Sequence, residues 1–217
     1  MGELTLDRVL IIGPLEPGSP FNRLVSPLPD GSSPSAELLC PEGGRSPGVR
    51  EAVSRSRIVV LAGDPARSRA VADDIWHLLR QKVVLSTDEA MTVDTLRSIC
   101  PLSKVARGSF CIGGDVDRNL LLLSADGSLS GGDLQSLRSA LSPLGEILAV
   151  NEPLLEAALS EARSASAAIS RLLGELKESS SIDRDVCEYL LGWVLYGVGD
   201  AAIKGKRLDE ALPPPGK

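Results

Sequence analysis

Short apolar runs alternate with amphipathic segments over the first 150 residues of the chain. Each run is rich in valine, isoleucine and leucine and is bounded by glycine, proline or charged residues, as buried strands of a parallel sheet are. The strands predicted in this way cover residues 8–13, 36–40, 57–62, 82–86, 103–106, 120–124 and 146–150. The segments between them predict helices over residues 49–56, 65–79, 93–100 and 130–144.

Two of the segments between the strands allow more specific helix predictions. The stretch 14–35 holds six prolines, which leave room for one or two helical turns, with Ser19 as the capping residue and Pro20 in the first turn. In the predicted helix 65–79, the apolar residues expected on one face are Ala70, Val71, Ile75, Leu78 and Leu79. Strands that alternate with helices predict an α/β fold with a Rossmann-like, doubly wound parallel sheet.

The pattern changes after Asn151, where only helices are predicted, over residues 153–178 and 182–203. The second helix contains YLLGWVLYGVG, which is apolar on every side and favours burial in a bundle or a subunit interface. We therefore predict two regions: a Rossmann-like domain of the dinucleotide-binding type over 1–150, and a helical dimerisation region over 151–217.

Composition excludes several classes of function. The net charge of −6 and an isoelectric point near 4.9 argue against general nucleic-acid binding, which needs a basic face. With a single histidine, His77, the chain offers no basis for a histidine metal site, and we expect no metal. The four scattered cysteines favour buried free thiols in a reducing compartment. No secretion signal and no apolar stretch of roughly 20 residues is evident, so we expect a cytoplasmic protein without a membrane partner.

The loop after the first predicted strand is where a dinucleotide binds in this type of fold. Its outer glycines, Gly13 and Gly18, have the spacing of the GxGxxG motif, and the loop Gly13, Pro14, Leu15 to Gly18 is the candidate cofactor site. The middle glycine is replaced by Leu15, the two prolines offer no N–H group, and Glu16 adds a negative charge. Normal NAD(P)H binding is therefore not expected, and a proline-rich turn that only connects two elements is the alternative.

Several segments from residue 57 onward resemble, in order, those of pyrroline-5-carboxylate reductase, the NAD(P)H-dependent enzyme that forms proline. The segments are RIVVLAGDP, KVVLSTDEAMTVDTLRSICP, KVAR and SGGDLQSLRSALSPLGEILAVNEPLLEAAL. The resemblance implies the family's fold and a homodimer formed through the C-terminal helices. It further implies cofactor contacts at Ala62, Gly63 and Pro65, and substrate contacts at Ser164 and Ser166.

The chain departs from the family at the positions that carry function. Asp64 stands where the family has a lysine before proline, and Ser109, Phe110 and Cys111 replace its Met-Pro-Asn. The family's serine- and glycine-rich substrate motif falls on residues 162–167, where Ser164 and Ser166 could line a polar pocket or could simply belong to a helix that packs through small residues.

These departures leave two functions open, and we assign no catalytic residue. The first is a divergent protein of the reductase type with weak or lost NAD(P)H binding, which acts as a dimeric scaffold or binds a small ligand. The second is an active NAD(P)H-dependent reductase of pyrroline-5-carboxylate or a related cyclic imine, since the cofactor carries most of that chemistry.

Overall fold

The computed structural model describes residues 8–15, 17, 19–26, 36–40, 47–111 and 119–179, together with Val186, Gly192 and Leu195. The chain divides into two compact units, Met1–Leu155 and Glu156–Lys217. Each unit is described by itself below.

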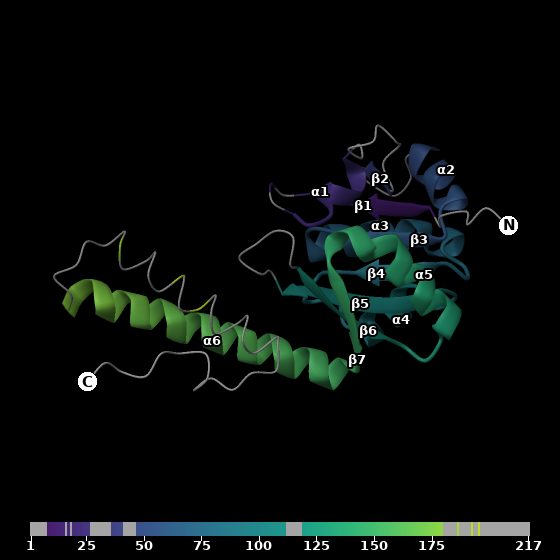
Figure 1. Cartoon of the computed structure of the whole chain (residues 1–217). Helices are drawn as coiled ribbons and strands as arrows, with labels where there is room; N and C mark the ends of the chain where they lie inside the picture. The colour runs from purple at the N-terminus through teal and green to yellow at the C-terminus, as the bar shows by residue number, and fades with distance from the viewer. Residues whose placement is uncertain are drawn as a thin grey trace, which may run out of the picture. The chain divides into compact units, whose positions relative to one another are not determined.

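The first unit is built on one sheet, and every predicted strand is present in it (Figure 1). In the described part of the chain the strand order is β2-β1-β3-β4-β5-β6-β7. The strands are β1 (Val9–Ile12), β2 (Ala36–Leu39), β3 (Ile58–Leu61), β4 (Val83–Ser86), β5 (Lys104–Cys111), β6 (Leu120–Ala125) and β7 (Glu146–Val150). The α/β, Rossmann-like fold class predicted from the sequence is confirmed.

The sheet is mostly parallel, and the expectation of a wholly parallel sheet is wrong at one pair. Strands β5 and β6 are antiparallel, with Ala106 opposite Ala125 and Cys111 opposite Leu120, whereas β6 and β7 are parallel to each other. A parallel neighbour requires a crossover connection of about a dozen residues or more, whereas an antiparallel one can follow a short link. Only residues 112–119 separate β5 from β6, so the chain turns back on itself there.

The helices of the first unit follow the predicted segments closely. They are α1 (Asn22–Val25), α2 (Pro47–Arg55), α3 (Pro65–Ile75), α4 (Val93–Ile99) and α5 (Gly131–Leu141), with 3-10 turns η1 (Trp76–Leu78) and η3 (Ser142–Leu144). Side-chain oxygens cap three of them: Asp64 caps α3, Thr92 caps α4 and Ser130 caps α5, the last in a capping box with Asp133.

Two details of the helix predictions are wrong. Phe21 rather than Ser19 precedes α1, and it makes no side-chain capping bond; the Ser19 carbonyl instead accepts a hydrogen bond from the Asn22 N–H. In α3, Ala70 is exposed whereas Ala72 is fully buried. The reason is geometric: Ala70 lies about 140° round the helix from the buried Ile75, and Ala72 only about 60°.

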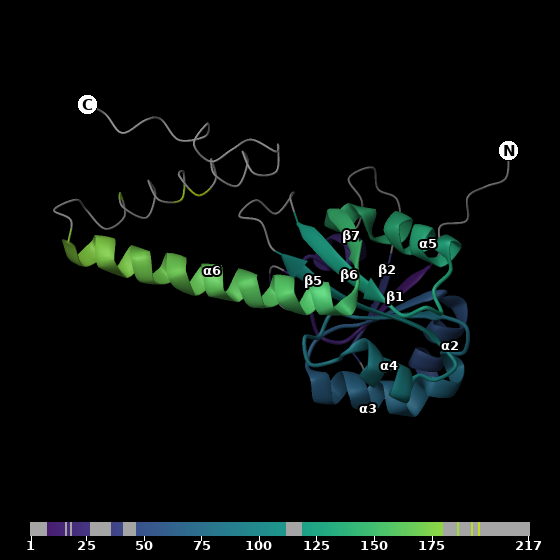
Figure 2. The ribbon, with the colours of Figure 1, turned by 90° about the horizontal axis from the view of Figure 1, so that it is seen from below.

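The core consists of two layers, one on each face of the sheet (Figure 2). Helices α2, α3 and α4 cover one face, where their apolar residues pack against alternate strand residues such as Leu10, Val59 and Val84. Helices α1 and α5 cover the other, with strand residues such as Ile11 and Val60. Because both faces are covered, the central strands are apolar throughout, as the sequence pattern indicates.

The described part of the second unit is the remainder of α6 (Glu152–Ser179), a helix that begins in the first unit. This confirms the helix predicted over 153–178. The predicted helix over 182–203 lies outside the described residues except for Val186, Gly192 and Leu195. Among the described residues no helix combines the length and the apolar character that a bilayer crossing requires.

The prediction that the cysteines are buried is confirmed for Cys100 and wrong for Cys40. Cys100 is buried, and burial raises the pKa of its thiol to about 12. Cys40 is exposed, because it follows the last residue of the edge strand β2.

Candidate functional site

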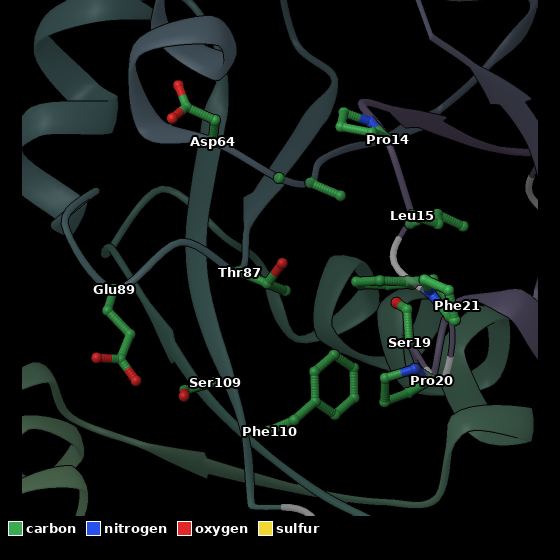
Figure 3. A pocket seen from close by; sticks show the side chains of 13 residues that line it. Pro14, Leu15, Ser19, Pro20, Phe21, Asp64, Thr87, Glu89, Ser109 and Phe110 are labelled. Atoms are coloured by element: carbon green, nitrogen blue, oxygen red, sulfur yellow. The ribbon is translucent and has the colours of Figure 1, made fainter.

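A cavity of about 880 Å³ opens where four parallel strands end (Figure 3). This is the position at which ligands bind in open α/β sheets, and the volume falls in the usual range of ligand pockets. The residues that line it come from the segments that follow β1, β3 and β4 and from the last residues of β5. They are Pro14, Leu15, Pro17, Ser19, Pro20, Phe21, Ala62, Gly63, Asp64, Thr87, Glu89, Ser109 and Phe110.

Close packing fixes the end of β1 beside the cavity. Gly13 has a φ of +133°, and a Cβ atom placed on it would lie 1.7 Å from the carbonyl oxygen of Ala62. Its N–H donates a hydrogen bond of 2.9 Å to the Leu39 carbonyl. A glycine is therefore required at position 13 for the approach of β3, whether or not any ligand binds.

The segment that joins the Gly13 turn to α1 already uses its first helical N–H groups. The N–H groups of Asn22, Arg23 and Leu24 donate to the carbonyls of Ser19, Pro20 and Phe21, over 3.0, 3.2 and 3.0 Å. Helix α1 itself is only four residues long. It does not provide the long helix with free N-terminal N–H groups on which a diphosphate sits in dinucleotide-binding folds.

Two phenylalanines form an apolar wall of the cavity. The rings of Phe21 and Phe110 meet edge to face, with centroids 5.3 Å apart and planes at 83°. Phe21 is buried in the core layer under α1 and α5, and Leu15 and Phe110 pack against the same layer. This wall is therefore held in place by the core and suits an apolar ligand body.

The charged groups that line the cavity are both acidic. They are Asp64 and Glu89, and no lysine, arginine or histidine is among the lining residues in the described part of the chain. The Asp64 carboxylate accepts a hydrogen bond of 2.9 Å from the Arg67 N–H and so caps α3. The described lining residues thus offer no side-chain cation to an anionic ligand.

Three hydroxyl groups also line the cavity, those of Ser19, Thr87 and Ser109. Ser109 is the most buried of them, with 6% of its surface exposed. Among the described residues, none forms a hydrogen bond with the Ser109 hydroxyl. Figure 3 shows it on the cavity wall beside Phe110. A hydroxyl in this position can form hydrogen bonds with a ligand or with water in the cavity.

A buried arginine positions the loop that carries Glu89. Arg107, on β5, is 1% exposed, and its guanidinium donates a hydrogen bond of 2.7 Å to the backbone carbonyl of Glu89. The same guanidinium pairs with Glu152 at 3.4 Å, and the Glu152 carboxylate accepts the N–H of Val93 at 2.9 Å. This network fixes the carboxylate-bearing loop after β4 relative to β5.

The structure brings together only part of the predicted site. Pro14, Leu15, Ala62 and Gly63 line the cavity, and Gly13 lies directly behind it. Of the remaining predicted positions, Pro65 begins α3 just after the lining residue Asp64. Ser164 and Ser166 are exposed on α6 in the second unit, and Gly18 lies outside the described residues. Their proposed ligand contacts stay predictions.

Sequence reasoning missed most of the polar residues of the cavity. No motif in the sequence marks Thr87 or Glu89, and Ser109 and Phe110 stand out there only as departures from a family motif. The signal that could have found them is positional: each follows or ends a strand at the edge where the parallel strands terminate.

The strand order and the place of the cavity define the class, a Rossmann-like α/β fold of the kind used by nicotinamide-dependent oxidoreductases. Within that class, the solved structures similar to this chain include pyrroline-5-carboxylate reductases. That of Coxiella burnetii matches with a TM-score of 0.73 at 15% identity, over 98% of this chain and 87% of the other.

Two further reductases of the same name match over a similar extent. The Plasmodium falciparum protein, with NADP bound, has a TM-score of 0.69 at 13% identity, over 100% of this chain and 87% of its own. The Streptococcus pyogenes protein has a TM-score of 0.65 at 14% identity, over 97% and 86%. No protein-family model and no curated protein matches the sequence. At these identities the likeness is one of fold, and at that level it confirms the predicted resemblance.

Proposed function

We propose that this protein uses the pyrroline-5-carboxylate reductase fold to bind a small ligand, and that it binds NAD(P)H weakly or not at all. The observation that carries the proposal is the state of the backbone after β1. The N–H groups of Gly13 and of Asn22 to Leu24 already donate to carbonyl oxygens, so these four groups are not available to a diphosphate.

The composition of the loop supports the same proposal. Pro14 and Pro17 have no N–H group and lie at the cavity wall. Leu15 is partly buried against the core layer and also lines the cavity, at the position where the dinucleotide motif has its second glycine. The carboxylate of Asp64, which also lines the cavity, would repel a diphosphate. The residues present therefore do not fit the cofactor.

A titration with NADPH and NADH tests the proposal. The protein is titrated by cofactor fluorescence and by calorimetry, and no saturation is expected below about 1 mM, which corresponds to a binding free energy weaker than about 4 kcal/mol. A dissociation constant in the micromolar range would contradict the proposal.

A variant sharpens this test. Leu15→Gly/Glu16→Ala removes the bulky side chain and one negative charge from the loop, and it is expected to bind NADPH more tightly than the natural protein. Its matched control is Leu102→Gly/Glu51→Ala, which makes the same changes at exposed residues that do not line the cavity. The control is expected to leave cofactor binding unchanged.

The second candidate function is an NAD(P)H-dependent reductase of pyrroline-5-carboxylate or a related cyclic imine. The likeness to three reductases over nearly the whole chain favours it, as does the NADP in one of those structures. It requires micromolar binding of NADPH, together with oxidation of NADPH when pyrroline-5-carboxylate is added. Absence of both at millimolar cofactor would leave ligand binding as the function.

We also propose that the C-terminal helices form a homodimer. The support is the exposure of α6 in the second unit, where Leu172 is 44% exposed. A second copy of the chain would cover such residues. Light scattering coupled to gel filtration is expected to give twice the chain mass of 22.8 kDa, and Leu172→Glu is expected to shift the population towards monomer. A monomeric natural protein would contradict this assembly.

A further inference from the structure

We propose that the cavity is regulated through helix α6. Glu152, the first residue of α6, holds the loop over residues 87–91 in place, and this loop carries Thr87 and Glu89 of the cavity lining. The loop is therefore ordered only while the first turn of α6 is formed. The inference rests on the proposed function, because it concerns the control of the same cavity. Three sets of contacts carry it, at the end of the loop, in its middle and at the beginning of α6.

The first contact holds the end of the loop. The carboxylate oxygen Oε1 of Glu152 accepts a hydrogen bond of 2.9 Å from the N–H of Val93. Val93 is the first residue of α4 and lies two residues after the loop. An N–H group at this position has no acceptor within its own helix. A residue 59 positions further along the chain thus supplies the acceptor that fixes the junction between the loop and α4.

The second set of contacts holds the middle of the loop. The same Oε1 atom of Glu152 lies 3.4 Å from the guanidinium of Arg107, which is buried on β5. Arg107 in turn donates a hydrogen bond of 2.7 Å to the backbone carbonyl of Glu89. The Met91 N–H donates to the Asp88 carbonyl over 3.1 Å, so the residues around Glu89 form a compact turn. Glu152 and Arg107 together therefore set the position of this turn beside the cavity (Figure 3).

The third set of contacts begins α6. The Asn151 side chain accepts the Leu154 N–H at 2.9 Å, and the Asn151 carbonyl accepts the N–H of the fully buried Leu155 at 3.0 Å. The Glu152 side chain is 26% exposed, so its carboxylate can pass into water when this turn frays, whereas Arg107 stays buried. Helix ends open locally at a small cost in free energy. The formed and the frayed turn therefore correspond to a held and a released loop.

Control of this kind works in both directions. A ligand that binds the ordered loop better than the released loop also stabilises the first turn of α6, and stabilisation of α6 favours the ligand by the same factor. Helix α6 continues through Ser179 into the second unit, so events there can reach the cavity along one helix. The homodimer proposed above is one such event, because a second copy that covers α6 would raise the affinity of the cavity.

Hydrogen exchange of the full-length protein, followed by NMR without any ligand, tests the coupling. Asn151→Ala removes the side-chain cap of α6 and leaves the loop itself unchanged. The amides of Ala90, Met91 and Val93 are expected to exchange about fivefold faster, the factor that corresponds to the loss of a helix cap. Ser130→Ala is the matched control, because it removes the cap of α5, and it should not alter these three amides. Loop amides that do not respond to Asn151→Ala, or that respond equally in the control, would overturn the proposal.

Removal of the Glu152 carboxylate tests whether the coupling runs through this residue. In Glu152→Ala the Val93 amide should exchange at least about tenfold faster, and the addition of Asn151→Ala should have no further effect on the loop. Glu152→Gln keeps an oxygen acceptor for Val93 and is expected to restore most of its protection. The control is Glu161→Ala, which removes an exposed carboxylate from the same helix and should change no loop amide. An effect of Asn151→Ala that persists in the Glu152→Ala background would contradict the link.

The outcome is distinguishable from that of the proposed function, because the exchange rates are measured without cofactor. Micromolar NADPH binding would refute the proposed function and leave the coupling intact. Unchanged exchange in Asn151→Ala would refute the coupling and leave the proposed function standing.

Discussion

The two ends of the sheet differ in how the polar side chains are hydrogen-bonded. At the amino ends of β3 and β5, Asp133 accepts hydrogen bonds of 2.7 Å from Lys104 and 2.6 Å from Ser130, and Arg57 lies 3.5 Å away. Asp133 is buried, and its carboxylate is surrounded by donors. Burial alone would raise the pKa of Asp133, but the hydrogen bonds from Lys104 and Ser130 outweigh that effect and hold the pKa well below its usual range.

At the carboxyl ends of the strands the backbone is just as closely packed, but two side-chain hydroxyls, those of Thr87 and Ser109, form no hydrogen bond with the described residues. Gly13 has a positive φ angle and lies against the Ala62 backbone, and Gly63 has a positive φ angle and lies against Pro14. The hydroxyls of Thr87 and Ser109, in contrast, line a cavity. Polar groups that complete the fold are paired within it, and polar groups left open at a cavity are available to a ligand. The contrast separates the end of the sheet at which Asp133 is paired from the end at which the hydroxyls of Thr87 and Ser109 line a cavity.

The largest effect is expected from Gly13→Ala. A Cβ at this position would meet the Ala62 carbonyl oxygen at 1.7 Å, and the φ of +133° strains any other residue, so we expect a loss of about 4 kcal/mol or failure to fold. Urea denaturation measures the change. Gly127→Ala, where nothing lies within 4 Å, is the control and should cost less than about 0.5 kcal/mol. A stable Gly13→Ala variant would show that the end of β1 is not fixed by close packing.

The next largest effect on the free energy of unfolding is expected from Asp133→Asn, at the amino ends of the strands. Removing the charge leaves Lys104 without its ionic partner and is expected to cost about 3 kcal/mol in the free energy of unfolding. The exposed Asp73, changed to asparagine, is the matched control, with an expected change within about 0.5 kcal/mol. Equal effects at both positions would remove the distinction between a paired and a solvated carboxylate.

The pH dependence of the same pair follows from the lowered pKa of Asp133. Because the folded pKa lies below the unfolded value of about 3.9, the carboxylate stabilises the folded state fully above pH 5, and this stabilisation is lost as the pH falls towards the folded pKa. The difference in unfolding free energy between the natural protein and Asp133→Asn should therefore be constant from pH 7 to about pH 5 and shrink below it. A difference that grows on acidification would contradict the account.

The smallest expected effect is that of Ser109→Ala on stability. Since the Ser109 hydroxyl has no partner among the described residues, its removal should change the free energy of unfolding by less than about 0.5 kcal/mol, or stabilise the protein slightly. Thermal unfolding without added ligand measures it. A loss comparable to that of Asp133→Asn would place Ser109 among the structural polar groups.

Much of the fold can be predicted from the sequence, because the central strands are short, continuous apolar runs bounded by glycine, proline or charged residues, which is typical of a sheet covered on both faces. The direction of β6 cannot be predicted in this way, because the run LLLLS is equally apolar whether the strand is parallel or antiparallel to β5. The short link 112–119 between β5 and β6 is what favours the antiparallel direction. The role of Asp64 could have been inferred, since an acid before a proline marks a helix start.

The cavity itself is less accessible to sequence reasoning. Thr87, Glu89 and Ser109 belong to different segments, and none forms a motif on its own. They meet because parallel strands end at one edge, which becomes evident only when the strand order is known. The glycine loop shows the opposite case: its residue types alone predict that a diphosphate is poorly held, and this stays a prediction.

The most direct test of the central claim is to observe the backbone amides after β1 while NADPH is added. In a ¹⁵N–¹H NMR titration of the full-length protein, we expect the chemical shifts of the amides of Gly13 and of Asn22 to Leu24 to stay unchanged up to about 1 mM NADPH. The reason is that each of these N–H groups already donates a hydrogen bond to a carbonyl. Saturable shifts of these amides at micromolar NADPH would show that the turn does accept the diphosphate, and would contradict the account.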